Sequence, residues 1–158
     1  MIVVGVDGSE ESKQALRWAL GEAATRGTSL RVVDVWQLPL IDYWSYLPSD
    51  LLNRKVFEEH ALEVIAEALD ETGGSESPVE IERVTCEGEA ARVLVDLSSA
   101  AELLVVGSRG HGGFTGLLLG SVSQHCVQHA ACPVVVVRAG VDAKSTGRQK
   151  EAVVDVSN

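Results

Sequence analysis

The segment Leu103–Val122, LLVVGSRGHGGFTGLLLGSV, constrains the fold and chemistry of this chain more than any other. It begins with an apolar run, Leu103–Val106, typical of a strand buried on both faces. It ends with Gly120, Ser121 and Val122, a pattern that predicts the start of a helix. The glycines between let backbone N–H groups approach an oxyanion, and a helix start adds unpaired donors and a positive dipole end. The segment therefore predicts a strand, a glycine-rich loop and a helix that together bind a phosphate ester.

The spacing of these glycines excludes two common kinds of phosphate-binding loop. Two residues separate Gly107 from Gly110, nine separate Gly110 from Gly120, and Ser121 follows at once. The chain contains no Gly-Lys-Ser/Thr, so the loop is not a Walker A loop, and the spacing is too long for the dinucleotide fingerprint of Rossmann folds. The alternative is a glycine-rich surface connection, but so long a connection with so many glycines is unusual without a function.

Apolar runs alternate with helical periodicities along the rest of the chain. The expected strands are Ile2–Val6, Leu30–Val35, Val79–Val84, Leu103–Val106 and Val134–Val137. The expected helices run from an N-cap at Ser9 to Gly27, over Leu51–Glu71, Glu89–Ser98 and Ser121–Ala130. The strand–helix alternation predicts an α/β fold: a doubly wound parallel sheet with right-handed crossovers and helices on both faces.

Two of these elements carry more specific predictions. In the second helix, the residues expected to face inward are Val56, Leu62, Ile65, Ala66 and Leu69. The third strand carries Glu80 and Glu82 between apolar residues, so one of its faces is wet and it belongs near a sheet edge. Pro39 and Pro48 interrupt any regular helix between the second strand and the second helix.

The charge and cysteine content limit the partners and the compartment. The chain of 158 residues has 13 Lys plus Arg against 23 Asp plus Glu, a net charge of -10. This balance argues against nucleic acid or an anionic membrane as a partner, and it requires a divalent cation beside any polyanionic nucleotide. No apolar run is long enough to span a membrane and no signal peptide precedes Ile2. Three cysteines, an odd number without a disulfide-like spacing, favour a reducing cytoplasm.

The glycine pattern, Gly-x2-Gly-x9-Gly-Ser from Gly107 to Ser121, resembles the signature of the ATP-binding branch of the universal stress protein family. The opening IVVGVDGS (Ile2–Ser9) and the closing CPVVVVR (Cys132–Arg138) are similar to that family too, so the resemblance covers residues 1–138 as one domain. It implies five strands in the order 3-2-1-4-5, with the first and fourth side by side. It also implies a homodimer that pairs the Val134–Val137 edge strand with its copy. Residues 139–158 lie outside it and are expected to form a polar linker and tail.

The resemblance also implies which residues bind the nucleotide. They are Asp7, Val35, Gly107, Arg109, Gly110, Gly120, Ser121, Val122 and Ser123. Asp7 is expected near the ribose and base, although an aspartate before a glycine also organises a turn. The backbone at Val35 is expected to meet adenine. Ser121 and Ser123 either cap the helix or donate to phosphate, and Arg109 is either a phosphate ligand or a solvent-exposed loop residue.

Other polar and aromatic groups have weaker claims to a function. His125 and His129 lie one helical turn apart near Cys126, but Cys126 points elsewhere on the helix, which favours solvent-facing histidines over a metal site. His111 could touch phosphate or act as a base. The aromatic residues of segment 36–50 either cover the site or pack against the second helix. The apolar patch of the tail, Val153–Val156, either adds to a sheet edge or stays untethered.

Three functions remain open at this point. The first is a regulatory, cytoplasmic stress-response protein that senses or stores ATP with Mg²⁺ or Mn²⁺. The second is a slow nucleotide hydrolase, at most a weak ATPase. The third is a dimeric scaffold that binds AMP or a cyclic nucleotide. Only the hydrolase needs a positioned base and groups that stabilise a transition state.

Overall fold

Five parallel strands form one central sheet in the computed structural model, which describes residues 1–38, 53–110 and 119–138. The strands are β1 (Ile2–Val6), β2 (Leu30–Trp36), β3 (Ile81–Glu87), β4 (Leu103–Gly107) and β5 (Val134–Val137). The helices are α1 (Glu10–Arg26), α2 (Arg54–Thr72), the short 3₁₀ helix η3 (Gly74–Glu76), α3 (Ala90–Ser98) and α4 (Ser121–His129). The strand order β3-β2-β1-β4-β5 confirms the predicted doubly wound fold.

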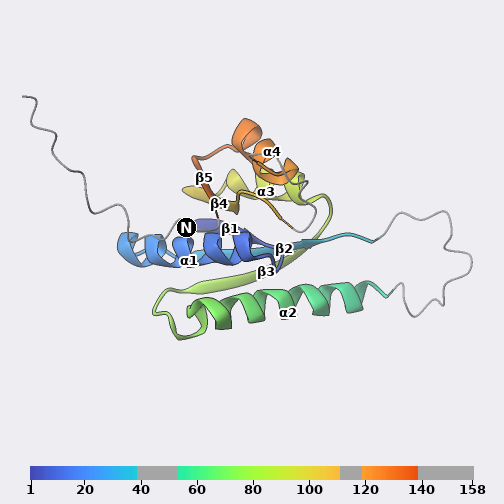
Figure 1. Cartoon of the computed structure of the whole chain (residues 1–158), viewed down its shortest axis with the longest axis horizontal. Coiled ribbons are helices and arrows are strands. Elements are labelled where there is room, and N and C mark those ends of the chain that lie inside the picture. The colour runs from blue at the N-terminus through green and yellow to red at the C-terminus, as the bar shows by residue number, and fades with distance from the viewer. Residues whose placement is uncertain (39–52, 111–118, 139–158) are drawn as a thin grey trace, which may run out of the picture.

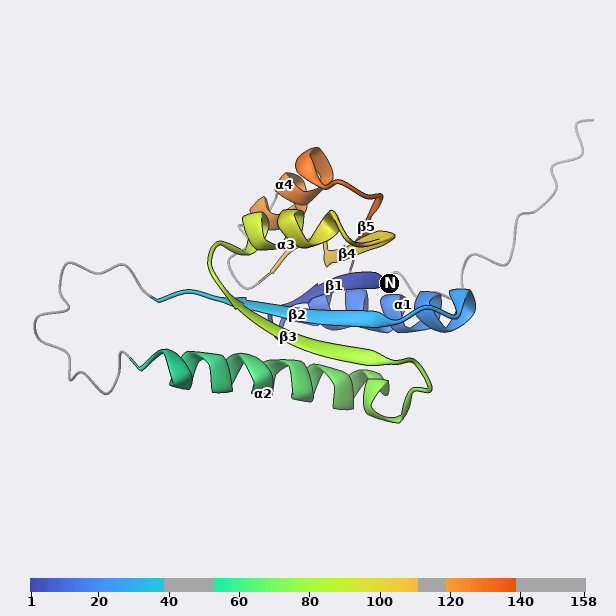
Figure 2. The same cartoon turned by 180° about the vertical axis from the view of Figure 1, so that it is seen from behind.

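Helices cover both faces of the sheet. Figures 1 and 2 show α1 and α2 on one side and α3 and α4 on the other. The side chains of each strand alternate between two apolar clusters because successive residues of a strand point to opposite faces. In β1, Val4 packs with α1 and α2, whereas Val3 packs with α3 and α4. This double burial explains why β1 and β4 are almost uninterrupted apolar runs.

Helix α1 begins and ends where the sequence predicts. The Ser9 side chain caps it by accepting a hydrogen bond from the Ser12 N–H, and Glu10 and Glu11 lie in its first turn. At its other end Gly27 adopts φ 62°, a left-handed conformation that glycine reaches without a steric penalty. The alanine and leucine face of the helix is fully buried against the sheet.

Helix α2 buries a narrower face than its apolar pattern predicts. Ile65 and Leu69 are buried as expected, together with Ala61 and Ala68. The prediction was wrong for Val56 and Leu62, which are 52% and 42% exposed. A helix that packs on a sheet by one face contacts it through residues three and four apart. Val56 lies on the side of α2 opposite the stripe through residues 61, 65, 68 and 69, and Leu62 lies at the margin of that stripe.

The two sheet edges differ in chemistry. β3 lies at one edge as predicted, but it runs from Ile81 to Glu87 instead of Val79 to Val84, because it pairs in register along the whole of β2. Its charged residues suit an edge exposed to water. β5 lies at the other edge and consists of four valines, each half-buried.

Part of the aromatic segment packs against α2. The Trp36 ring stacks on Phe57 at a centroid distance of 5.9 Å. For Trp36, this contact favours packing against α2 over covering the site. Tyr43, Trp44 and Tyr46 lie outside the described residues, as do His111 and the tail 139–158. Among the helices that the structure describes, none is long and apolar enough to cross a membrane.

Candidate functional site

The central feature of the site is a gap between β1 and β4. These neighbours pair from Ile2↔Leu103 to Val4↔Val105 and then separate. Beyond that point each strand keeps only its outer neighbour: Val6 still pairs with Asp34 on β2, and Val106 with Val136 on β5. The winding of the sheet reverses here, and ligands of doubly wound folds bind in such a crevice at the carboxyl ends of the strands.

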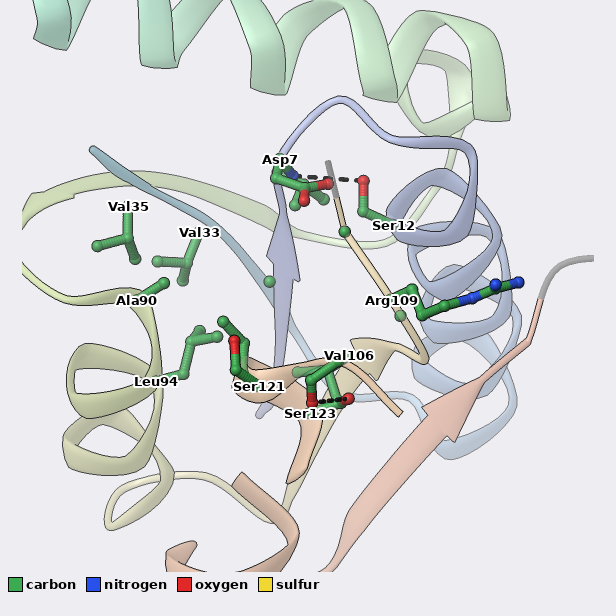
Figure 3. Close-up of a pocket in the computed structure, with 16 residues that line it drawn as sticks. Asp7, Ser12, Val33, Val35, Ala90, Leu94, Val106, Arg109, Ser121 and Ser123 are labelled. Carbon is green, nitrogen blue, oxygen red and sulfur yellow. Dashed lines mark hydrogen bonds between the residues drawn. The ribbon is translucent and has the colours of Figure 1, made fainter. Parts of the chain in front are cut away.

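A cavity of about 470 Å³ occupies this gap, a volume within the usual range for ligand sites. All nine residues predicted to bind a nucleotide line it. They come from β1 (Asp7 follows it), β2, β4 and the start of α4, segments up to 116 positions apart in the sequence (Asp7 and Ser123) that meet at one end of the sheet (Figure 3). The other lining residues are Gly5, Val6, Ser12, Val33, Ala90, Leu94 and Val106.

The start of α4 forms one end of the cavity. Gly120 is its N-cap, with φ -76° and ψ 167°, and no side chain caps the helix. The first N–H groups of any helix have no partner within the helix, so those of Ser121 and Val122 are available to an anion. The Ser108 carbonyl holds this end in place, because it accepts from the Gly120 N–H at 2.7 Å and from Ser123 Oγ at 3.0 Å.

Ser123 has a structural role in this arrangement. It is buried, and its hydroxyl faces two carbonyl oxygens, those of Ser108 at 3.0 Å and Gly120 at 2.9 Å. Its single proton is therefore engaged by the backbone and is not available for donation to a ligand. The exposed Ser121 hydroxyl stays a candidate phosphate donor.

Steric space requires glycine at two of the three motif positions, and unusual torsion angles require it at none. Positive φ occurs elsewhere, as at Gly8 in the turn after β1, whereas the three motif glycines are not among the positive-φ residues. A Cβ on Gly107 would lie 2.9 Å from the Glu11 backbone, and one on Gly110 would collide with Asp7 Oδ2. A Cβ on Gly120 would have room, with its nearest neighbour at 3.4 Å. The fold therefore does not itself require glycine at position 120.

Arg109 points out of the predicted phosphate position. Its guanidinium lies 3.6 Å from the Glu11 carboxylate, and Figure 3 shows the side chain directed across α1, away from Ser121. This contact connects the loop after β4 to the first turn of α1. Arg109 lines the cavity, but its side chain would have to leave Glu11 to contact a phosphate at Ser121, so its role as a phosphate ligand stays a prediction.

Asp7 organises the turn between β1 and α1. Its Oδ1 accepts from the Ser9 N–H at 3.0 Å and from Ser9 Oγ at 2.5 Å, which is the turn-forming role considered from the sequence. The carboxylate is exposed and also lines the cavity, so the structural role and a ligand role coexist. Figure 3 shows Asp7 across the cavity from Ser121.

The opposite end of the cavity is apolar. Val33, Val35, Ala90 and Leu94 form it, and the lack of a side chain on Gly5 lets Leu94 approach, since a Cβ there would lie 3.0 Å from Leu94 Cδ1. β2 continues past the last residue that β1 pairs with, Asp34. By the alternation of a parallel ladder, the Val35 carbonyl faces the side where β1 has ended. It is thus an acceptor presented to the cavity.

Several residues of this apolar end carry no recognisable signal in the sequence. Val33 has the pattern of any buried strand residue, and Ala90 and Leu94 that of a helix core face. They enter the site because α3 packs over the gap between the strands. Only the tertiary arrangement distinguishes them from ordinary core residues.

A second carboxyl group, Asp34, lies near Asp7 at the end of β2. It is only 8% exposed. Burial, together with the negative charge of Asp7, raises the pKa of Asp34 to about 6, and His60 on α2 partly offsets the shift. Asp34 is not recognisable as a site residue in the sequence, because one aspartate within a strand forms no motif.

The histidines of α4 do not form a metal site with the neighbouring cysteine. The rings of His125 and His129 lie 4.4 Å apart, but Cys126 is fully buried and its thiol pKa is raised to about 11 by that burial. Among the residues that the structure describes, no group of three or more His, Cys, Asp or Glu side chains could hold a metal ion. Cys86, Cys126 and Cys132 are all free thiols.

Comparison with known proteins agrees with the fold and the motif. A family model for the universal stress protein family matches residues 1–138. This chain belongs to the universal stress protein family. A universal stress protein of Mycolicibacterium smegmatis is 37% identical over 143 residues, which cover 86% of this chain and 47% of that protein. One from Mycobacterium tuberculosis is 36% identical over 137 residues, 87% of this chain and 44% of that protein. The chain therefore spans about half the length of these curated relatives.

Solved structures of universal stress proteins share the fold. UspA from Lactobacillus plantarum superposes with a TM-score of 0.72 at 22% identity, covering 87% of this chain and 96% of that one. A universal stress protein in complex with cAMP gives 0.63 at 28% identity, with 86% and 94% coverage. The protein from Archaeoglobus fulgidus in complex with dAMP gives 0.53 at 25% identity, with 86% and 95% coverage.

Proposed function

We propose that this universal stress protein is a regulatory ATP-binding protein that takes its nucleotide with Mg²⁺ or Mn²⁺ in the crevice between β1 and β4. The observation that carries the proposal is the meeting of all nine predicted residues around one cavity at the point where the two strands separate. Nothing in the spacing of the motif alone requires Asp7 and Val35 to lie beside it.

The two ends of the cavity suit the two ends of a nucleotide. The apolar surface of Val33, Val35 and Leu94 suits the faces of a base, and the Val35 carbonyl can accept from an exocyclic amine. The N–H groups at the start of α4 suit phosphate. Asp7 lies across the cavity from Ser121 (Figure 3), where it can accept hydrogen bonds from ribose hydroxyl groups.

A divalent cation would be held mainly by the nucleotide. The cavity presents one carboxylate, Asp7, among its described lining residues. Mg²⁺ commonly binds phosphate oxygens and waters with few protein ligands, so this donor set fits a metal that arrives with the nucleotide. The cation would also reduce the repulsion between polyphosphate and a protein with a net charge of -10.

A second candidate is a protein that prefers a nucleoside monophosphate or a cyclic nucleotide. The observation in its favour is that two family members at 25–28% identity are described as complexes with dAMP and cAMP. Both candidates use the same cavity, and they differ in how many phosphates the start of α4 must accommodate.

Titration calorimetry distinguishes these candidates. We expect ATP to bind in the presence of Mg²⁺ and more weakly in EDTA, and to bind more tightly than AMP or cAMP. Asp7→Asn keeps an oxygen for Ser9 but removes the charge, so affinity is expected to fall by roughly 10- to 100-fold, as for a lost charge-assisted contact of about 1.5–3 kcal/mol. Absence of ATP binding at millimolar concentration contradicts the proposal, and a preference for AMP or cAMP selects the second candidate.

We also propose that the protein is a homodimer in a reducing, cytoplasmic compartment. The apolar β5 edge, in contrast to the charged β3 edge, supports pairing with a second copy. The three free thiols support the compartment.

A further inference from the structure

A second cavity, of about 430 Å³, lies beside the first. Four residues line both cavities: Val35, Ala90, Ser121 and Val122. The two cavities therefore adjoin each other along the end of β2, the start of α3 and the start of α4. A group attached to a phosphate at the start of α4 would lie beside the second cavity.

The second cavity has a different chemical character from the first. Gln37, Glu89 and His125 line it and do not line the first cavity. Glu89 precedes α3, but its side chain makes no capping bond, so its carboxylate is not engaged by the helix. Gln37 offers both donors and acceptors, and His125 offers ring nitrogens. Val35, Ala90 and Val122 supply apolar surface beside these polar groups.

This lining excludes some ligand groups and favours others. The Glu89 carboxylate accepts hydrogen bonds and repels phosphate, so the second cavity does not suit a longer polyphosphate chain. A mixture of acceptors, an amide and apolar surface suits an uncharged group with several hydroxyls, such as a sugar or a nucleoside. Ser121 and Val122, whose N–H groups suit phosphate, lie at the boundary between the two spaces.

We propose that the site also accepts a nucleoside diphosphate whose terminal phosphate carries an uncharged polyhydroxyl group, and that this group occupies the second cavity. The inference rests on the proposed nucleotide function of the first cavity and adds the class of ligand. Nucleotide sugars and dinucleoside polyphosphates share this chemistry, and they differ in whether the second group carries a base.

The experiment compares three ligands with a common ADP part: ADP, ADP-ribose and diadenosine diphosphate. Titration calorimetry on the full chain with Mg²⁺ is expected to show ADP-ribose, diadenosine diphosphate or both binding at least about tenfold more tightly than ADP. A preference for ADP-ribose alone identifies a sugar-sized group. A tenfold gain for diadenosine diphosphate, beyond the twofold statistical gain of its symmetry, identifies a second nucleoside.

A pair of double variants tests where the preference arises. The double variant Gln37→Ala with His125→Ala removes polar groups from the second cavity. In this variant we expect the extended ligand and ADP to bind with about equal affinity. Gln128→Ala with His129→Ala is the matched control, since both side chains are exposed and line neither cavity. ADP-ribose carries less negative charge than ADP, and a preference that came from this charge difference alone would be the same in both double variants. A loss of the preference only in the Gln37 and His125 variant therefore does not come from charge.

The outcomes separate the two proposals. If ADP binds and neither extended ligand binds more tightly, the second cavity is not a ligand subsite and the inference is overturned, while the proposed function stands. If the preference survives in the Gln37 and His125 variant, its source lies elsewhere and the inference is overturned as well. If no adenine nucleotide binds to the wild type, the proposed function fails first and the inference fails with it.

Discussion

Asp34 is a carboxyl group that this fold buries without a hydrogen-bonding motif around it. Its pKa of about 6 means that the folded protein binds its proton more tightly than the unfolded chain, where the pKa is about 3.9. The sign of the linkage follows: the cost of ionising Asp34 in the folded protein is absent below about pH 4, grows as pH rises from about 4 to 6 and then stays constant. Asp34 therefore opposes folding at neutral pH.

The first prediction concerns the stability of Asp34→Asn. At pH 7–8 we expect the variant to be more stable than the wild type, with a free energy of unfolding that is higher by up to about 3 kcal/mol. The difference should vanish near pH 4. Urea denaturation at several pH values measures it. Asp96→Asn, at an exposed position on α3, is the control and should change little. A gain that is the same at pH 4 and pH 8 contradicts the assignment of this pKa.

We expect alanine to have different effects at two glycines of the motif, on nucleotide affinity at Gly120 and on stability at Gly107. Gly120→Ala has room for its methyl group and an ordinary φ of -76°, so we expect a folded protein that loses no more than about 1 kcal/mol as a poorer N-cap. Gly120 lines the cavity, so under the proposed function we expect the added methyl group to hinder the nucleotide and to lower its affinity at least tenfold in calorimetry. Gly21→Ala on α1, where a Cβ meets nothing within 4 Å, is the matched control for both measurements.

Gly107→Ala should instead destabilise the protein. Its Cβ would lie 2.9 Å from the Glu11 carbonyl carbon and 3.0 Å from the Glu11 oxygen, and backbone atoms cannot move aside as a side chain can. We expect a loss of about 1–3 kcal/mol in the free energy of unfolding. Equal stability of Gly107→Ala and Gly120→Ala would show that the close approach of β4 to α1 is not required.

The sequence could predict which residues line the cavity, but not the contacts that each of them makes. The spacing from Gly107 to Ser121 is visible in one dimension, and these residues do line the cavity. It could not show that Gly110 makes room for Asp7, that Arg109 turns toward Glu11, or that Ser123 donates to the Ser108 carbonyl. Each of these depends on a partner at least 15 positions away.

The β5 strand determines how the sheet can extend. Val135 packs against the α1 side and Val134 and Val136 against the α3 and α4 side, so each face is already used within the chain. Pro133 and Val137 direct their carbonyl groups to β4. By the alternation of the ladder, Val136 directs its N–H and carbonyl away from β4, toward the free edge.

The edge can therefore be blocked without removing a bond of the sheet. Val136→Pro deletes a donor on the outer side only, a position where sheets tolerate proline. We expect light scattering to give twice the 16.8 kDa chain mass for the wild type and a single mass for the variant, with similar circular dichroism. Val135→Glu is a poorer test, because it would place a charge against the core. A monomeric wild type at micromolar concentration contradicts the dimer.

At the level of elements, periodicity located every described strand and α-helix, and the errors lie at the faces and boundaries. The ends of β3 follow from its pairing with β2, and the exposure of Val56 and Leu62 follows from their position outside the buried stripe of α2. The strand order came from the family resemblance, since periodicity carries no information about which strands are neighbours. The hydrophobic pattern of a segment therefore predicts that a helix or strand forms, whereas the elements packed against it determine where it ends and which of its side chains are buried.

The distribution of charge over the molecule bears on catalysis. The segment from Gly110 to Cys132 contains no lysine and no carboxylate, and the guanidinium of Arg109 faces Glu11. The backbone donors at the start of α4 would stabilise phosphate equally in the ground state and in the transition state. If ATP binds there as proposed, we expect the described residues to bind it without accelerating its cleavage.

We accordingly expect little or no hydrolysis. Single-turnover release of labelled phosphate, with protein in excess and Mg²⁺ or Mn²⁺ present, should be far slower than 1 s⁻¹, the low end of the range of roughly 1–10³ s⁻¹ for enzymes. A rate near 1 s⁻¹ would establish the enzyme alternative. Loss of that rate in His111→Ala would then identify the base.

The sheet consists of two parts, β3-β2-β1 and β4-β5, which are joined at three paired positions because β1 and β4 separate after Val4 and Val105. The proposed nucleotide would contact Val35 on the first part and Gly110 after β4 on the second, so it would connect the two parts at their separated ends. We therefore expect binding to reduce the motion of the two parts relative to each other and to slow amide hydrogen exchange at Val6 and Val106.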